Sequence, residues 1–329
     1  MTDFLRNMDA TQQIGALFII VFGVLFAFSL YGFLQSLHEQ PDTPMGDARH
    51  MELHNARGLR KTSWFMVTIF WIGWVLGDTV ATTLFGIVAF FALREFITLS
   101  PTRRGDHRSL VLAFFVVLPI QFVLVGTKHF DLFTVFIPVY VFLAVPVVSV
   151  LADDPQRFLE RNAKLQWGIM VCIYGMSHVP ALLLLDFPNY RDKGAFLVFF
   201  LVFVVQTCMV VQHMAGIKLK RPPSAPNVSQ SFNWTSWAIG VIAASLLGAV
   251  MTGITPFKPG QALALAFIAA VSGSLGHLVM KAIKRDRGVT SWGMQGLSAT
   301  GAGGLLDRVD ALCFAAPIFF HSVRWYFGL

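Results

Sequence analysis

The chain is built as a series of long apolar runs separated by short, basic loops. Ten runs approach the roughly 20 apolar residues that a helix needs to cross a bilayer. They cover residues 14–34, 63–76, 79–93, 109–125, 130–151, 166–185, 194–214, 237–254, 262–280 and 311–327. Because backbone polar groups find no water inside a bilayer, such runs must satisfy their hydrogen bonds internally, as helices do. The pattern predicts an all-α, polytopic integral membrane protein with nine or ten transmembrane helices.

The composition excludes a soluble globular domain. Of 329 residues, 55% are hydrophobic and 13% are charged, about half the charged share of a soluble domain. The net charge of +7 comes from Lys and Arg in loops, where anionic lipid headgroups account for it, so no nucleic-acid partner is expected. Cys172, Cys208 and Cys313 lie in apolar runs without pairing or metal-ligand spacing.

Two features of the topology concern the first third of the chain. The runs 63–76 and 79–93 flank Gly77 and Asp78, and we interpret them as a hairpin of two short helices. One long tilted helix with an interior Asp is the alternative. No cleavable signal peptide is visible, so the first run is expected to remain as an anchor. We therefore divide the chain into an N-terminal anchor helix with a cytoplasmic loop, 1–62, and a membrane-embedded domain, 63–329.

The basic residues are divided unevenly between the two sets of loops. Nineteen of the 25 Lys and Arg lie in the loops at 35–62, 94–108, 152–165, 215–236 and 281–310. The positive-inside rule places these loops in the cytoplasm and, with ten spans, both termini outside. No internal repeat is visible and charges within the runs are few, so a transporter is the least favoured class.

The segment 281–310 has the composition of a polyphosphate site. Four cations precede a glycine-rich stretch and two carboxylates, in the order Lys281, Lys284, Arg285, Arg287, Gly301, Gly303, Gly304, Asp307, Arg308 and Asp310. Small residues let backbone N–H groups approach phosphate oxygens, cations neutralise them, and carboxylates three apart on a helix can hold Mg²⁺. The alternative is that the cations only anchor the chain at the membrane and that Asp307 is an N-cap.

Several motifs resemble those of CDP-diacylglycerol synthases, the phosphatidate cytidylyltransferases. The most specific is Leu306-Asp307-Arg308-Val309-Asp310, after Gly303-Gly304 and before Phe314-Ala315-Ala316-Pro317. Other segments resemble motifs of that family in the same order: Leu93-Arg94-Glu95-Phe96, Ala225-Pro226-Asn227-Val228-Ser229 and Lys284-Arg285. Phe158-Leu159-Glu160-Arg161 is similar to a segment of the longer bacterial paralogues. The chain resembles that family over most of residues 55–329.

The resemblance implies transfer of CMP from CTP to phosphatidate, giving CDP-diacylglycerol and pyrophosphate in a bacterial inner membrane. Asp307 and Asp310 are then the expected ligands of Mg²⁺, with Lys284, Arg285 and Arg308 as further catalytic residues on the phosphates. The expected substrate-binding residues are Ser229, Asn233, Gly301, Gly303 and Gly304. The expected partners are CTP, phosphatidate or a related phospholipid and the bilayer, and a homodimer is left open.

The chain departs from the family pattern at several places. Thr290-Ser291 stand where the family has Lys-Asp, Ala302 where it has His, and Phe232-Asn233-Trp234-Thr235 where it has Lys-Thr-Trp-Glu. Gln206 aligns with an expected acid. These changes remove Lys side chains and up to three carboxylates, so a catalytically silent homologue that binds lipid or nucleotide is the second hypothesis. A CTP-dependent lipid-alcohol kinase is the third. Asp78, Glu95, His178 and His213 are assigned no role in the chemistry.

Overall fold

The computed structural model describes residues 75–100, 102–187, 194–289, 291–292 and 304–329, with isolated residues before position 72. This part of the chain is helical, apart from one isolated bridge between Ala225 and Ser229. The predicted all-α class is therefore confirmed for it. The runs 14–34 and 63–76 and the division at residue 62 lie almost wholly outside the described residues, and the division stays a prediction.

The first half of the described chain forms four helical rods. Helix α4 spans Asp78–Thr98. The second rod joins a short 3₁₀ turn, Arg104–Asp106, to α5, His107–Leu112, a π-helical stretch, Ala113–Val117, and α6, Leu118–Gly126. The third joins α7, Phe130–Val135, through Phe136–Val141 to α8, Phe142–Val150. The fourth joins α9, Phe158–Gly168, through Ile169–Gly175 to α10, Met176–Leu183.

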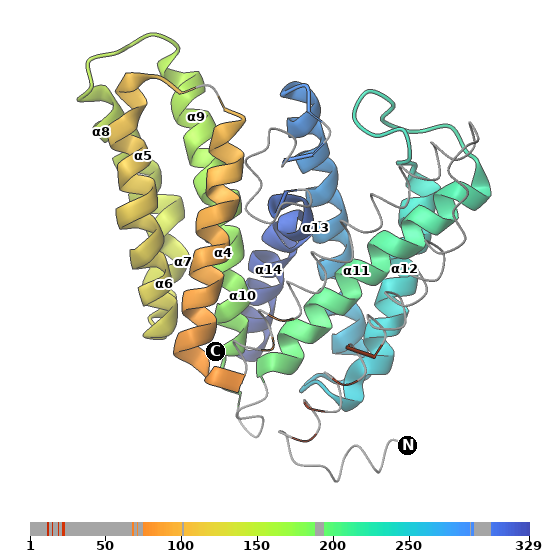
Figure 1. The fold of residues 1–329 in the computed structure, drawn as a ribbon. Helices are drawn as coiled ribbons and strands as arrows, with labels where there is room; N and C mark the ends of the chain where they lie inside the picture. The colour runs from red at the N-terminus through yellow and green to blue at the C-terminus, as the bar shows by residue number, and fades with distance from the viewer. Residues whose placement is uncertain are drawn as a thin grey trace, which may run out of the picture.

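The second half consists of longer, regular helices. Helix α11 spans Gly194–Leu219 and α12 spans Trp234–Val250, followed by a 3₁₀ turn, Met251–Gly253. Helix α13 spans Pro259–Asp286 and α14 spans Leu306–Phe327. Helices α11, α12 and α13 pack on one another, and α13 packs along α14, which lies inside the bundle between the two halves (Figure 1).

Each of the three π-helical stretches contains a proline or shortly precedes one. The prolines are Pro119, Pro138 and Pro180. A proline has no N–H to donate and its ring clashes with the carbonyl four residues earlier, so the hydrogen-bond ladder widens there. The rods therefore continue through these points as locally widened helices.

Six helices of the described chain are long and apolar enough to cross a membrane. They are Asp78–Thr98, Arg104–Gly126, Phe130–Val150, Gly194–Leu219, Trp234–Gly253 and Pro259–Asp286. Each corresponds to a predicted run. The predicted runs 166–185 and 311–327 are also helical, but they belong to the more polar, interior rods and are not among the six. The predicted count of nine or ten is not confirmed.

The chain breaks sharply between the second and third predicted runs. Gly77 has a φ of +91°, a backbone conformation that favours glycine, and α4 begins at the next residue. Val75 and Leu76 are helical on the other side of this break. One continuous helix through Gly77 and Asp78 is therefore excluded, as the hairpin interpretation requires.

Glycines let the interior helices approach closely. A Cβ added at Gly276 of α13 would lie 2.2 Å from Phe314 Cγ on α14. A Cβ added at Gly175 would lie 2.3 Å from the carbonyl oxygen of Cys313, on another side of α14. Small residues at such contacts are typical of helices that pack in membranes, where shape complementarity replaces the hydrophobic effect. Helix α14 is thereby held closely on two sides.

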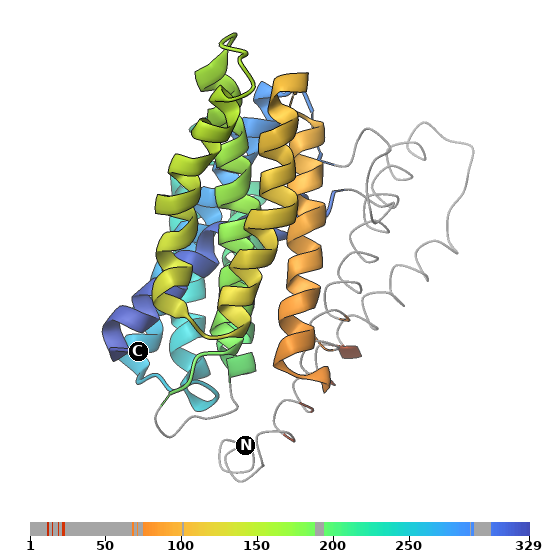
Figure 2. The ribbon, with the colours of Figure 1, turned by 90° about the vertical axis from the view of Figure 1, so that its left-hand side faces the viewer.

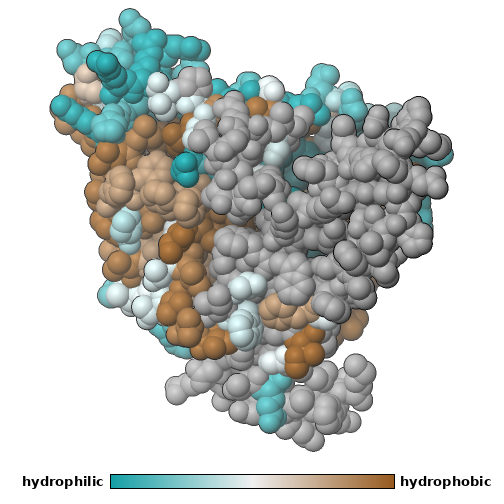
Figure 3. Space-filling model, in the orientation of Figure 1, coloured by the Kyte–Doolittle hydropathy of each residue, from teal (hydrophilic) through white to brown (hydrophobic). Residues whose placement is uncertain are grey.

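The outer faces of the first-half helices are apolar, as a lipid-facing surface must be. Phe115, Val123, Leu143 and Val147 are exposed large hydrophobic side chains on the second and third rods. Figure 3 shows apolar colour along the side of these helices and hydrophilic colour at their upper end. This distribution supports membrane insertion with the helix axes across the bilayer.

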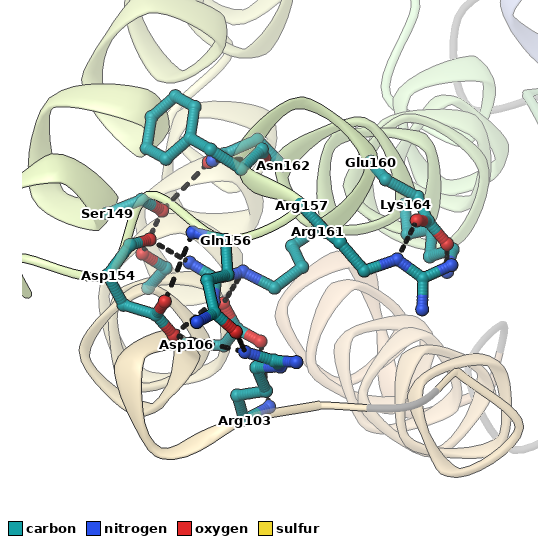
Figure 4. A network of polar contacts seen from close by, with 12 residues as sticks. Arg103, Asp106, Ser149, Asp154, Gln156, Arg157, Glu160, Arg161, Asn162 and Lys164 are labelled. Carbon is teal, nitrogen blue, oxygen red and sulfur yellow. Dashed lines mark hydrogen bonds and ion pairs between the residues drawn. The ribbon is translucent and has the colours of Figure 1, made fainter.

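Several basic loops gather at one end of the bundle. The end of α4, the loop between α8 and α9 and the end of α13 lie at the upper end in both ribbon views (Figures 1 and 2). A polar network joins two of them (Figure 4). In it, buried Arg161 pairs with Asp106, at 3.1 Å, and with Asp154. Loops that the charge count assigns to one side are therefore neighbours in space.

Candidate functional site

A cationic pocket of about 270 Å³ lies between the last turns of α13 and the loop before α12. Its lining residues are Val228, Ser229, Gln230, Ser231, Lys281, Lys284, Arg285 and Val289. The three cations lie at positions i, i+3 and i+4 of one helix, so they share a face. No carboxylate belongs to this lining, and hydroxyl groups complete it. A surface of this composition favours an anion.

Lys284 connects the pocket to the first turn of α14. Its Nζ lies 2.5 Å from Asp307 Oδ1, and the side chains are only 9% and 14% exposed. The other carboxylate oxygen of Asp307 accepts hydrogen bonds from Ser291 Oγ, at 2.5 Å, and from the backbone N–H of Trp292, at 3.0 Å. The predicted site residues Lys284 and Asp307 are thus brought together, and both oxygens of Asp307 have protein donors.

The start of α14 is held by a side chain from α4. Glu95 is buried, and its two carboxylate oxygens accept hydrogen bonds from the backbone N–H groups of Leu305 and Leu306, each at 2.9 Å. A carboxylate is the natural partner of the unpaired N–H groups at a helix N-terminus. The alternative that Asp307 itself is the N-cap is wrong, because Asp307 lies within the first turn. Glu95 was assigned no role from the sequence.

Asp310 has a separate set of partners. Its Oδ2 lies 2.8 Å from His277 Nδ1 of α13, and its Oδ1 accepts a hydrogen bond from the backbone N–H of Ala311, at 2.6 Å. Like Glu95, His277 is a site residue that the sequence reasoning missed. Ionisable residues at membrane depth generally have a partner or a function, and that rule was the signal available for both.

The loop before α12 supplies the hydroxyl side of the pocket. The backbone N–H of Ser229 donates to the carbonyl of Ala225, at 2.8 Å, which closes a tight turn. Buried Ser229 Oγ lies 3.5 Å from Lys281 Nζ. Asn233 caps α12, since its side-chain oxygen accepts hydrogen bonds from Ser236 N and Oγ, at 2.8 and 2.9 Å. Ser229 therefore lines the pocket, whereas Asn233 has a structural partner.

Among the other predicted site residues, the structure describes Arg285, Arg308 and Gly304. Arg285 lines the pocket and is exposed. Arg308 is not among the lining residues, and its buried Nε has no hydrogen-bond partner within the described chain. Gly304 is buried ahead of α14. Gly301 and Gly303 lie outside the described residues.

The donor sets do not fit a Mg²⁺ ion held jointly by Asp307 and Asp310. Both oxygens of each carboxylate already have protein partners, and one of the donors to Asp307 is the ammonium group of Lys284. Among the described residues, no group of three or more His, Cys, Asp or Glu is placed to hold a metal. The neighbouring segment 293–303 contains none of these residue types. The expected metal ligation stays a prediction without geometric support.

Comparison with known proteins identifies a family model that covers most of the chain. Residues 59–326 match the model described as the cytidylyltransferase family. The chain is also 33% identical over 269 residues to the uncharacterized protein YnbB of Escherichia coli (strain K12). That match covers 81% of this chain and 87% of the relative.

Shorter matches reach two proteins named phosphatidate cytidylyltransferase. The one from Helicobacter pylori (strain ATCC 700392 / 26695) is 32% identical over 142 residues, which cover 43% of this chain and 51% of the relative. The one from Mycobacterium leprae (strain TN) is 29% identical over 133 residues, which cover 39% and 41%. The chain thus spans about half or less of these two relatives.

Proposed function

The chain belongs to the cytidylyltransferase family, and on that premise we propose that it transfers CMP from CTP to phosphatidate, giving CDP-diacylglycerol and pyrophosphate. The single observation that supports this reaction best is the pocket lined by Lys281, Lys284 and Arg285 at the end of a membrane-length helix. Both substrates are anions, and one of them is a lipid. A cationic pocket at a membrane surface suits both properties.

The proposed reaction is an in-line displacement at phosphorus. A phosphate oxygen of phosphatidate attacks the α-phosphorus of CTP and forms the new P–O bond. The bond from the α-phosphorus to the bridging α,β-oxygen breaks, and its electron pair leaves with pyrophosphate. The protein's task in such a transfer is to position two anions and offset their repulsion. In this proposal Lys281, Lys284 and Arg285 do so, and Ser229 donates a hydrogen bond to a phosphate oxygen.

The membrane arrangement in this proposal follows from the same residues. The acyl chains of phosphatidate stay in lipid beside the apolar faces, and its headgroup reaches the pocket at the membrane surface. We propose that this end of the bundle faces the cytoplasm of a bacterium, because it carries the basic loops and because CTP is a cytosolic metabolite. A topology reporter fused to the loop at 151–157 tests this orientation. We expect it to report a cytoplasmic location.

The experiment is an assay of the purified full-length protein in mixed micelles with CTP, Mg²⁺ and phosphatidate. We expect CDP-diacylglycerol and pyrophosphate in equal amounts. Lys281→Ala removes one pocket cation and should lower turnover about tenfold or more, the equivalent of one charge-assisted hydrogen bond. Lys218→Ala, on the exposed end of α11, is the matched control and should not change it. No product from the wild-type protein, or equal rates in both variants, would contradict the proposal.

A second candidate function is a silent homologue that binds nucleotide or lipid and regulates phospholipid synthesis. The observation that favours it is that both oxygens of Asp307 already accept hydrogen bonds, from Lys284, Ser291 and Trp292. Binding of CTP or phosphatidate without product formation in the same assay would select this candidate. Turnover by the wild-type protein would eliminate it.

A further inference from the structure

We propose that Asp307 is a positioning residue for Lys284, and that the pocket binds phosphate groups through its own cations without a resident divalent ion on Asp307 or Asp310. The inference deepens the proposed function, because it states how the same site neutralises its substrates. A divalent ion then arrives with the triphosphate of the nucleotide. The donors around the two carboxylates support both parts of this inference.

The first step is the contact between Lys284 and Asp307. Lys284 Nζ lies 2.5 Å from Asp307 Oδ1 and occupies one of the two lone-pair positions of that oxygen. Both side chains are largely buried. Displacing the ammonium group would leave a buried cation without its partner, which is strongly unfavourable. Lys284 therefore competes directly with any metal for Asp307.

The second step is the residue at position 291. Ser291 stands where the resemblance places an Asp, and its hydroxyl lies 2.5 Å from Asp307 Oδ2. A second carboxylate there would repel Asp307 unless a cation or a proton lay between them. A serine hydroxyl donates a hydrogen bond instead, so the substitution removes both a metal ligand and the repulsion that the metal would offset. The substitution and the contact with Lys284 point to the same charge balance.

The third step is the separation of the carboxylates. Asp310 is paired with His277 on α13, whereas both oxygens of Glu95 accept backbone N–H groups at the start of α14. Asp307, Asp310 and Glu95 thus have three separate sets of donors within the described chain. Lys284 also lines the pocket, so Asp307 fixes a cation that faces the ligand.

The first experiment measures Mn²⁺ binding by electron paramagnetic resonance on the full-length protein in detergent, without nucleotide. At equal concentrations of protein and ion, we expect the free-ion signal to keep its protein-free height. The proposal is overturned if the wild-type protein lowers the free-ion signal and either Asp307→Asn or Asp310→Asn returns it to its protein-free height. If the wild-type protein lowers the signal and neither variant returns it, the ion is bound elsewhere, which agrees with the proposal. Asp286→Asn, at the exposed end of α13, is the control for surface carboxylates.

The second experiment measures ligand binding by calorimetry in the presence of EDTA. One arm uses pyrophosphate. The other uses phosphatidate micelles, with phosphatidylcholine micelles as the control. We expect the wild-type protein to bind the ligand of at least one arm, and Lys284→Gln to bind it about tenfold more weakly. The arm that shows binding identifies whether the phosphate comes from the nucleotide or from the lipid. Binding that requires Mg²⁺ in both arms would overturn the proposal. Because neither experiment needs turnover, an inactive protein that passes both contradicts only the proposed function. An active protein with Mn²⁺ on Asp307 contradicts only this inference.

Discussion

Glu95 Oε1 accepts a 2.9 Å hydrogen bond from the backbone N–H of Leu305, a residue 210 positions further along the chain. The contact joins the end of the first described helix, α4, to the first turn of the last, α14. Because Asp307 follows two residues later, Glu95 sets the position from which Asp307 reaches Lys284. The site therefore depends on a carboxylate that lies outside the pocket.

Glu95→Gln should loosen the start of α14. The amide can accept one of the two backbone N–H groups, but its NH₂ group cannot accept the other, so one buried donor is left unpaired. Such a loss costs about 1–3 kcal/mol. Hydrogen exchange should show faster exchange at the amides of Leu305 and Leu306 and no change in α11.

Glu160→Gln is the matched control, because Glu160 is a half-exposed carboxylate whose partners are the neighbouring side chains of Arg157 and Lys164. It should leave exchange at Leu305 unchanged. Equal protection of Leu305 and Leu306 in wild type and Glu95→Gln would show that Glu95 does not hold the helix start.

Gly276→Ala should separate α13 from α14. The added Cβ would lie 2.2 Å from Phe314 Cγ, so one helix must move. Overpacking of this kind costs about 1–3 kcal/mol, and it should also lower turnover by shifting Lys284 relative to Asp307. Thermal unfolding in detergent measures the first effect and the micelle assay the second.

Gly260→Ala provides the comparison on the same helix. A Cβ at Gly260 meets nothing within 4 Å, so the change should be neutral or slightly stabilising. Similar unfolding temperatures for the two variants would contradict the close packing of α13 against α14.

Asp154 should stabilise the protein near neutral pH and lose this contribution at acid pH. The Arg161 guanidinium beside Asp154 holds the pKa of that carboxyl below its usual range. A carboxyl whose pKa is lower in the folded state contributes stability above its unfolded pKa of about 3.9 and loses that contribution as the pH falls through the folded value. We expect Asp154→Asn to be less stable than wild type at pH 6, with the difference shrinking below about pH 4.

Thermal unfolding of both proteins between pH 3 and pH 7 measures this difference. Asp153→Asn, one residue earlier in the same loop, is the control and should follow the wild-type curve. A difference between Asp154→Asn and wild type that stays constant down to pH 3 would be inconsistent with an ionised Asp154 paired to Arg161.

Hydropathy predicted the helices well because it depends on local composition. Runs such as 109–125 and 194–214 correspond to membrane-length helices, and Gly77 breaks the chain where the hairpin was predicted. The number of membrane-spanning helices was harder to predict from the sequence. Helix α14 carries Asp307, Arg308 and Asp310 in its first turns and lies inside the bundle, so its neighbours determine its place more than its hydropathy does.

The site was predicted in part. The order of residues in the chain indicated that Lys284 and Asp307 belong to one site, and they are in contact. The partners of Glu95 and Asp310 could not be predicted, because they depend on how α4 and α13 pack against α14. A single sequence contains no direct measure of that packing. The same reason explains why Ser291 and Trp292 could not be predicted as donors to Asp307.

The most direct test of the account follows the label from CTP. Full-length protein in phosphatidate micelles is incubated with CTP and Mg²⁺, the CTP being labelled with ³²P at the α-phosphorus in one reaction and at the γ-phosphorus in another. We predict that the α-label enters the lipid fraction as CDP-diacylglycerol and that the γ-label is released in pyrophosphate. γ-label in the lipid, with CDP as the other product, or no labelled product at all would contradict the assignment.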